Sequence, residues 1–67
     1  MTVQDYHPII ELGLSIKTWS VLRRNGIETI GELKSKSFSD LARMRNMGRK
    51  SIEEIGDKLG REDLKIM

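Results

Sequence analysis

Helix start signals recur at short intervals along the sequence. Each of Ser15, Thr29 and Ser37 precedes a short stretch with apolar residues at helical spacing, and such a hydroxyl can accept a hydrogen bond from the first turn of a helix. An acid follows three residues after Thr29 and Ser37, at Glu32 and Asp40. That is the spacing of a capping box. The intervals leave room only for short helices.

Glycines mark where these helices end. Gly26 and Gly60 follow stretches of helical spacing, and glycine accepts the left-handed conformation that closes a helix. The last helix is expected from about Arg49 to Leu59. Gly56 lies inside that helix and is expected to cost it ~1 kcal/mol relative to alanine.

The same spacing predicts an all-α fold, a compact bundle of four to five short helices. No stretch alternates apolar and polar residues for long enough to form a β-strand. Trp19 is interpreted mainly as a core residue, although it could also stack on a sugar or enter a partner's groove. The rest of the predicted core comprises Leu14, Ile16, Leu22, Ile27, Ile30, Leu33, Leu41, Met47, Ile52, Ile55 and Leu59.

A sequence of 67 residues is long enough for one small domain. Residues 1–8 have no apolar period and are expected to be a flexible N-terminal arm. Residues 9–60 are expected to form the helical domain, and residues 61–67 a C-terminal tail. The sequence has neither the apolar run that a signal peptide needs nor the ~20 apolar residues of a transmembrane helix. We therefore expect a soluble cytoplasmic protein with no membrane partner.

The residue types disfavour an enzyme and a metalloprotein. The protein has no cysteine, and its one histidine, His7, has no companion at ligand spacing. Paired carboxylates and nucleophile–base sets are also missing at suggestive spacing. We expect no catalytic residues, no metal and no cofactor.

The stretch from Met44 to Ile52 carries the strongest functional signal. Gly48 leaves the backbone bare, so another molecule can approach closely, and a helix start attracts an anion. Arg49 and Lys50 add charge, and Ser51 adds a donor. The stretch is interpreted either as a contact with a nucleic-acid phosphate or as a tight helix–helix turn with solvated cations.

The distribution of charge is more informative than the net charge of +2. Four cations crowd one turn, namely Arg43, Arg45, Arg49 and Lys50, and three more lie on another segment, namely Lys17, Arg23 and Arg24. A basic patch on a nearly neutral domain is a weak signal for nucleic-acid binding.

The run from Ile10 to Leu59 resembles the C-terminal domain of the bacterial RNA polymerase alpha subunit. The segment around Gly48 is the most specific part, and it is also similar to the hairpin of helix-hairpin-helix DNA-binding domains. Four segments carry the resemblance: Leu12-x-Leu14-Ser15-Ile16-Lys17, Leu22-Arg23-Arg24-x-Gly26-Ile27, Thr29-Ile30-x-Glu32-Leu33 and Arg45-Asn46-Met47-Gly48-Arg49-Lys50-Ser51-Ile52-x-Glu54-Ile55.

The resemblance implies a role in bacterial transcription, on the nucleoid. Such domains dock on the minor groove of A·T-rich double-stranded DNA upstream of promoters and contact transcription regulators. Carried over by position, Gly48, Lys50 and Ser51 would meet phosphates, with Asn46 beside them. Glu54 would lie one turn further on, facing the first helix, as a candidate orienting residue. RNA polymerase subunits are the other implied partners.

Several positions depart from the family pattern. The family's groove-reading arginine falls on Lys17 and its partner asparagine on Ser20. Arginine suits a narrow minor groove because its guanidinium is flat and weakly hydrated, whereas lysine is a strongly hydrated point charge. Gly13 replaces an acid that contacts the sigma factor in many members. The regulator-contacting surface maps to Ser37-Phe38-Ser39, which also differs.

Two function classes follow. The first is a DNA-binding module, within or related to the alpha subunit. The second is a protein-interaction module of the same fold that contacts polymerase or a regulator and binds little DNA. The DNA-binding residues expected for the first class are Lys17, Ser20, Asn46, Gly48, Arg49, Lys50 and Ser51.

Overall fold

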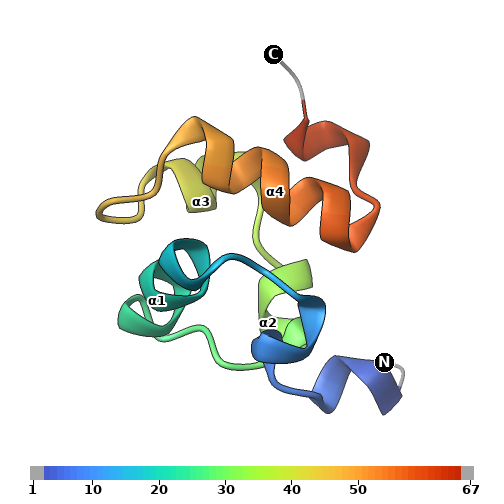
Figure 1. Cartoon of the computed structure of the whole chain (residues 1–67). Coiled ribbons are helices and arrows are strands. Elements are labelled where there is room, and N and C mark those ends of the chain that lie inside the picture. The colour runs from blue at the N-terminus through green and yellow to red at the C-terminus, as the bar shows by residue number, and fades with distance from the viewer. Residues whose placement is uncertain (1–2, 66–67) are drawn as a thin grey trace.

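Short helices joined by tight turns make up the described part of the protein. The structure, a computed structural model, describes residues 3–65. Its elements are η1 (Val3–Tyr6), η2 (Ile9–Leu12), α1 (Ile16–Arg24), α2 (Ile30–Lys34), α3 (Phe38–Ala42), α4 (Arg49–Leu59) and η3 (Glu62–Leu64), where η marks a 3₁₀ turn (Figure 1). These residues contain no strand, only an isolated bridge between Pro8 and Thr29. The predicted all-α fold is confirmed.

The helix start signals act where the sequence places them. The hydroxyl of Ser15 accepts the backbone N–H of Thr18 at 3.3 Å. Thr29 and Ser37 each form a complete capping box with the acid three residues further on. These bonds satisfy N–H groups that the first turn of a helix leaves unpaired. They define the starts of α2 and α3, which are only five residues long.

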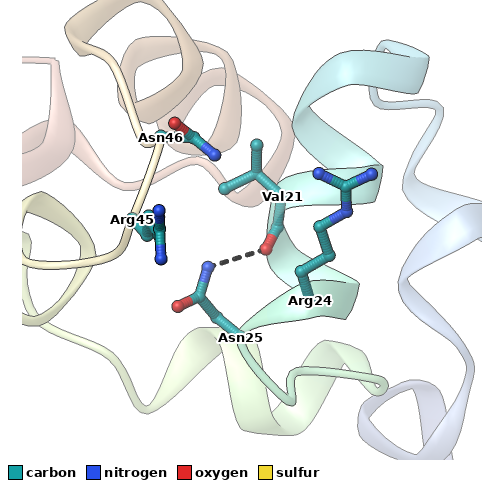
Figure 2. Close-up of a pocket in the computed structure, with 5 residues that line it drawn as sticks. All are labelled: Val21, Arg24, Asn25, Arg45 and Asn46. Carbon is teal, nitrogen blue, oxygen red and sulfur yellow. Dashed lines mark hydrogen bonds between the residues drawn. The ribbon is translucent and has the colours of Figure 1, made fainter.

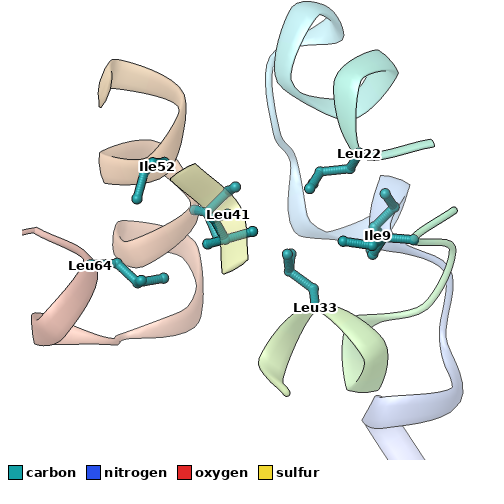
Figure 3. Close-up of a cluster of buried hydrophobic side chains, with 8 residues drawn as sticks. Ile9, Leu22, Leu33, Leu41, Ile52 and Leu64 are labelled. Carbon is teal, nitrogen blue, oxygen red and sulfur yellow. The ribbon is translucent and has the colours of Figure 1, made fainter. Parts of the chain in front are cut away.

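A single apolar cluster fills the centre of the domain (Figure 3). It takes side chains from all four α-helices, from η2 and η3, and from the turn after α1: Ile9, Leu22, Ile27, Leu33, Leu41, Ile52, Ile55 and Leu64. Leu14, Met47 and Leu59 pack against the cluster but are only partly buried. The sequence prediction missed Ile9 and Leu64, both fully buried.

The predicted burial of Ile16 is wrong, because this side chain is 80% exposed. The spacing of Ile16, Trp19 and Leu22 suggested one buried face. Leu22 is buried as predicted, but α1 is rotated so that Thr18 and Val21 are buried in place of Ile16. The polar Thr18 belongs on the buried face because its hydroxyl bonds to α4. Trp19 is partly buried and packs against the core, as expected.

The N-terminal segment packs against α2, unlike the loose arm expected for residues 1–8. Asp5 is buried, and its carboxylate pairs with Lys34 Nζ at 2.8 Å. The Asp5 backbone lies so close to Gly31 that a Cβ there would be 2.9 Å from the Asp5 carbonyl oxygen. The spacing of apolar residues in the sequence predicts neither the Asp5–Lys34 ion pair nor the packing of Asp5 against Gly31. Residues 1–2 lie outside the described residues.

The segment after α4 also packs against a glycine. A Cβ on Gly56 would lie 2.9 Å from Leu64 Cβ and 3.0 Å from the Arg61 carbonyl oxygen. Residues 61–65 therefore close the core where a tail was expected, and residues 66–67 lie outside the described part. This close approach explains why glycine occupies this helical position despite its lower helix propensity.

Gly56→Ala should destabilise the domain. Alanine favours a helix by ~1 kcal/mol over glycine, but overpacking costs about 1–3 kcal/mol, and here η3 would have to move. Urea unfolding would measure the change, with Glu53→Ala on the same helix as the comparison for a change to alanine that places no new atom against η3. A net gain in stability for Gly56→Ala would show that η3 does not pack on α4 in this way.

Candidate nucleic-acid interface

The turn between α3 and α4 is a hairpin that depends on Asn46. Asn46 has φ 67°, the one positive value at a non-glycine position among residues 3–65. Asparagine tolerates this left-handed conformation better than most residues. The backbone N–H of Met47 donates to the Met44 carbonyl at 3.2 Å and tightens the turn. The backbone then reaches the start of α4 in an extended conformation at Gly48.

Gly48 caps α4 without a side chain. Its φ of −97° suits any residue, so the backbone conformation does not require glycine here. A Cβ at this position would meet no protein atom within 4 Å. The Lys50 and Ser51 backbone N–H groups therefore face an open helix start, where the helix dipole favours an anion. The missing side chain at Gly48 leaves room for another molecule to approach the start of α4 closely.

Two cations flank this helix start. Lys50 is exposed and makes no ion pair with any residue in the described range 3–65. Arg49 is also exposed, and its Nε lies 4.0 Å from the Glu53 carboxylate. Exposed pairs of this kind are weak, but this one compensates the charge of Arg49 in part. Of the two, Lys50 offers the less compensated charge.

A hydrogen-bonded joint fixes α1 against α4. The carboxylate of Glu54 accepts the backbone N–H and the hydroxyl of Ser15, the latter at 3.0 Å. The same carboxylate accepts the hydroxyl of Thr18 at 2.6 Å. The hydroxyls of Thr18 and Ser51 lie 3.1 Å apart. We call these four residues the α1–α4 joint.

The joint changes the expected role of Ser51. A hydroxyl carries one proton, and that of Thr18 goes to the close, charged Glu54 oxygen, since a carboxylate is the stronger acceptor. The proton in the contact between Thr18 and Ser51 must then come from Ser51. The Ser51 side chain is also buried. Its hydroxyl is used inside the domain, and only its backbone N–H remains for a phosphate.

The joint favours the charged form of Glu54. Partial burial acts to raise the pKa of this carboxyl, but hydrogen bonds from Thr18 and Ser15 outweigh that effect, and nearby Lys58 adds to them. The net result is a lowered pKa. Glu54 faces the first helix, as the sequence predicted, whereas Thr18 was not singled out. Thr18 can be recognised as a partner of Glu54 only once the rotation of α1 about its axis is known.

The joint also places the predicted groove-reading residues. Lys17 lies between Ser15 and Thr18 in the first turn of α1 and is exposed. Ser20 lies about one turn further on and is partly buried. The joint therefore fixes the position of this turn of α1, which carries Lys17, relative to α4.

Asn46 lines a pocket of about 390 Å³ between the hairpin and the end of α1 (Figure 2). Arg45 contributes to the hairpin side, and Val21, Arg24 and Asn25 line the rest. The Asn25 side-chain amide donates to the Val21 carbonyl at 2.8 Å and so helps to end α1. The pocket was not predicted from the sequence.

Among residues 3–65, no three His, Cys, Asp or Glu side chains lie close enough together to hold a metal ion. None of the described helices combines the length and the apolar character needed to cross a membrane.

Comparison with known proteins identifies the family. The family of the C-terminal domain of the bacterial RNA polymerase alpha chain matches residues 2–61. The DNA-directed RNA polymerase subunit alpha of Frankia alni is 48% identical over 59 residues, which cover 88% of this chain and 17% of the relative. The corresponding subunit of Cutibacterium acnes is 48% identical over 52 residues, which cover 78% of this chain and 15% of the relative. The subunit of Carboxydothermus hydrogenoformans is 42% identical over 59 residues, which cover 88% of this chain and 19% of the relative.

The protein therefore belongs to the family of C-terminal domains of the bacterial RNA polymerase alpha subunit. It spans less than a fifth of the length of these curated relatives.

Glu54→Gln should destabilise the domain most at neutral pH. Because the folded pKa of Glu54 is lowered, its stabilising contribution is complete above the ordinary glutamate pKa. That contribution is lost as the pH falls through the lowered folded value. The difference in unfolding free energy between wild type and Glu54→Gln should narrow on acidification, measured by urea unfolding across pH. Glu53→Gln is the matched control. A difference that stays constant with pH would contradict a charged Glu54 in the joint.

Proposed function

We propose that this protein is a DNA-binding module in transcription, acting within or beside an RNA polymerase alpha subunit. The observation that carries the proposal is the start of α4, which has no side-chain cap and where bare Gly48 lies two residues before exposed Lys50. This combination of free N–H groups, positive dipole and full charge suits a phosphate.

Each predicted residue has a part in this proposal. The Lys50 and Ser51 backbone N–H groups bind a phosphate at the start of α4, and the Lys50 ammonium adds charge. Arg49 contributes more weakly, because Glu53 lies 4.0 Å away. Glu54 acts as a positioning residue through the α1–α4 joint. Catalysis is not part of the proposed role, and no cofactor is needed.

The α1 side of the surface meets the groove. Lys17 lies over the minor groove of A·T-rich DNA, with Ser20 about one turn away. A narrow A·T-rich groove concentrates negative potential, which attracts cations. The lysine gives weaker and less selective readout than an arginine would. Asn46 lies beside the phosphate at the hairpin.

The proposed setting is the bacterial cytoplasm, on nucleoid DNA near promoters. The relatives named as DNA-directed RNA polymerase subunit alpha support that setting. Polymerase subunits and transcription regulators are the proposed protein partners.

A protein-interaction module is the second candidate function. Phe38 is 40% exposed at the start of α3, and Ile16 is 80% exposed at the start of α1. Phe38 falls in the segment that the family resemblance assigns to regulator contact. In this alternative, these apolar side chains contact a protein and DNA binding is weak.

Lys50→Ala should weaken DNA binding about equally on all sequences. Losing one phosphate contact should flatten the plot of log affinity against log salt concentration by ~1. Gly48→Glu should weaken binding further, since a bulky anion would occupy the helix start. Fluorescence anisotropy across a salt series would measure both. An unchanged slope for Lys50→Ala would show that Lys50 is only a solvated lysine.

Lys17→Arg should strengthen binding and sharpen the preference for A·T-rich duplexes, because a guanidinium sheds water more readily than an ammonium. Adding Ser20→Asn should increase the gain, because the two positions are neighbours on α1. A mobility-shift series on A·T-rich and G·C-rich duplexes would compare the wild type with the single and double variants. No gain for the double variant would favour the protein-interaction module.

A further inference from the structure

We propose that the pocket between the hairpin and the end of α1 binds a second DNA backbone phosphate, through Arg24 and Arg45. This inference rests on the proposed DNA-binding function and adds a contact that the predicted site residues do not include. Figure 2 shows Arg45 and Asn46 on the hairpin side and Arg24 and Asn25 on the α1 side, with Val21 between them.

The lining of the pocket has the composition of an anion site. Two guanidinium groups and the Asn46 side-chain amide supply hydrogen-bond donors, and no carboxylate belongs to the lining. Within residues 3–65, neither Arg24 nor Arg45 makes an ion pair. Their charges are therefore uncompensated by neighbouring acids. Asn25 already satisfies the Val21 carbonyl at the end of α1, which removes a competing acceptor from the pocket.

The hairpin geometry aims donors at this pocket. The left-handed conformation of Asn46, at φ 67°, turns the backbone between Arg45 and the start of α4. Both Arg45 and Asn46 then line the pocket with side chains of α1. Non-glycine residues in this conformation are uncommon and occur often at functional sites.

The position of the pocket fits the DNA strand that is proposed to contact the start of α4 at Gly48. Two residues of extended backbone span at most about 7 Å, which bounds the separation of Asn46 from Gly48. Phosphates follow one another along a DNA strand with a rise of about 3.4 Å per nucleotide. Because Asn46 lines the pocket and Gly48 starts α4, the proposal places two nearby phosphates of one strand at these two positions.

A double-mutant cycle of Arg24→Ala and Arg45→Ala tests the proposal. Because both arginines neutralise the same phosphate, the double variant should flatten the salt slope by about 0.9. The two losses in affinity should also be non-additive. Arg43→Ala is the matched control, since Arg43 is an exposed cation near the hairpin that does not line the pocket. Circular dichroism would verify folding of these exposed-site variants.

The outcomes distinguish a failure of the pocket proposal from a failure of the proposed DNA-binding function. If Lys50→Ala flattens the salt slope but the arginine variants behave like Arg43→Ala, or combine additively, the pocket proposal fails alone. If no variant changes the slope, the DNA-binding function fails with it.

A free-phosphate experiment distinguishes the source of the anion. Inorganic phosphate, at ionic strength matched with chloride, should leave the amide resonances of Asn46 and Val21 little changed, while an A·T-rich duplex shifts them in the wild type and not in the double variant. Saturable shifts with inorganic phosphate, and none with duplex, would mean that the pocket takes a free anion and would overturn the proposal. Shifts caused only by an acidic peptide would overturn it in favour of a protein partner.

Discussion

The candidate surface depends on one carboxylate. Glu54 accepts two bonds from Ser15 and one from Thr18, and so ties the first turn of α1 to α4. Ser15 also caps α1, so the bond that starts the helix and the bonds that dock it share one residue. Thr18 and Ser51 form the buried part of this network, whereas Ser15 is exposed and Glu54 is partly buried. A polar network favours a single arrangement when its members are satisfied, and no described buried side-chain polar atom lacks a partner. The relative position of Lys17 and the start of α4 follows from that arrangement.

The rest of the domain supports the joint by closing a small core from both ends. The segments before α1 and after α4 each pack their backbone or side chains against a glycine, at Gly31 and Gly56. Leu64 fills the core from η3, while Asp5 pairs with Lys34 on α2. A protein of this length has little apolar surface to bury. Its short terminal segments therefore contribute to the fold. The start of α4 at Gly48 takes no part in this packing and stays open.

Local patterns in the sequence predicted the helices well and the contacts between them less well. The caps at Ser15, Thr29 and Ser37 and the bounds of α4 could be predicted because they depend on hydrogen bonds within a few residues. The burial of Ile16 was predicted wrongly, because apolar spacing does not reveal that a polar joint sets the rotation of α1. The contact between the Thr18 and Ser51 hydroxyls and the Arg24–Arg45 pocket both need tertiary contacts that no linear motif reports.

Amide chemical-shift mapping with an A·T-rich duplex tests most directly whether α1 and α4 together form one DNA-binding surface. Backbone resonances of residues 46–51 and of the α1 turn around Lys17 should shift together, with the same dependence on duplex concentration. Residues around Phe38, which the protein-interaction alternative uses, should stay unshifted. Shifts confined to the Phe38 region with a protein partner, and none at residues 46–51 with excess duplex, would contradict the DNA-binding surface.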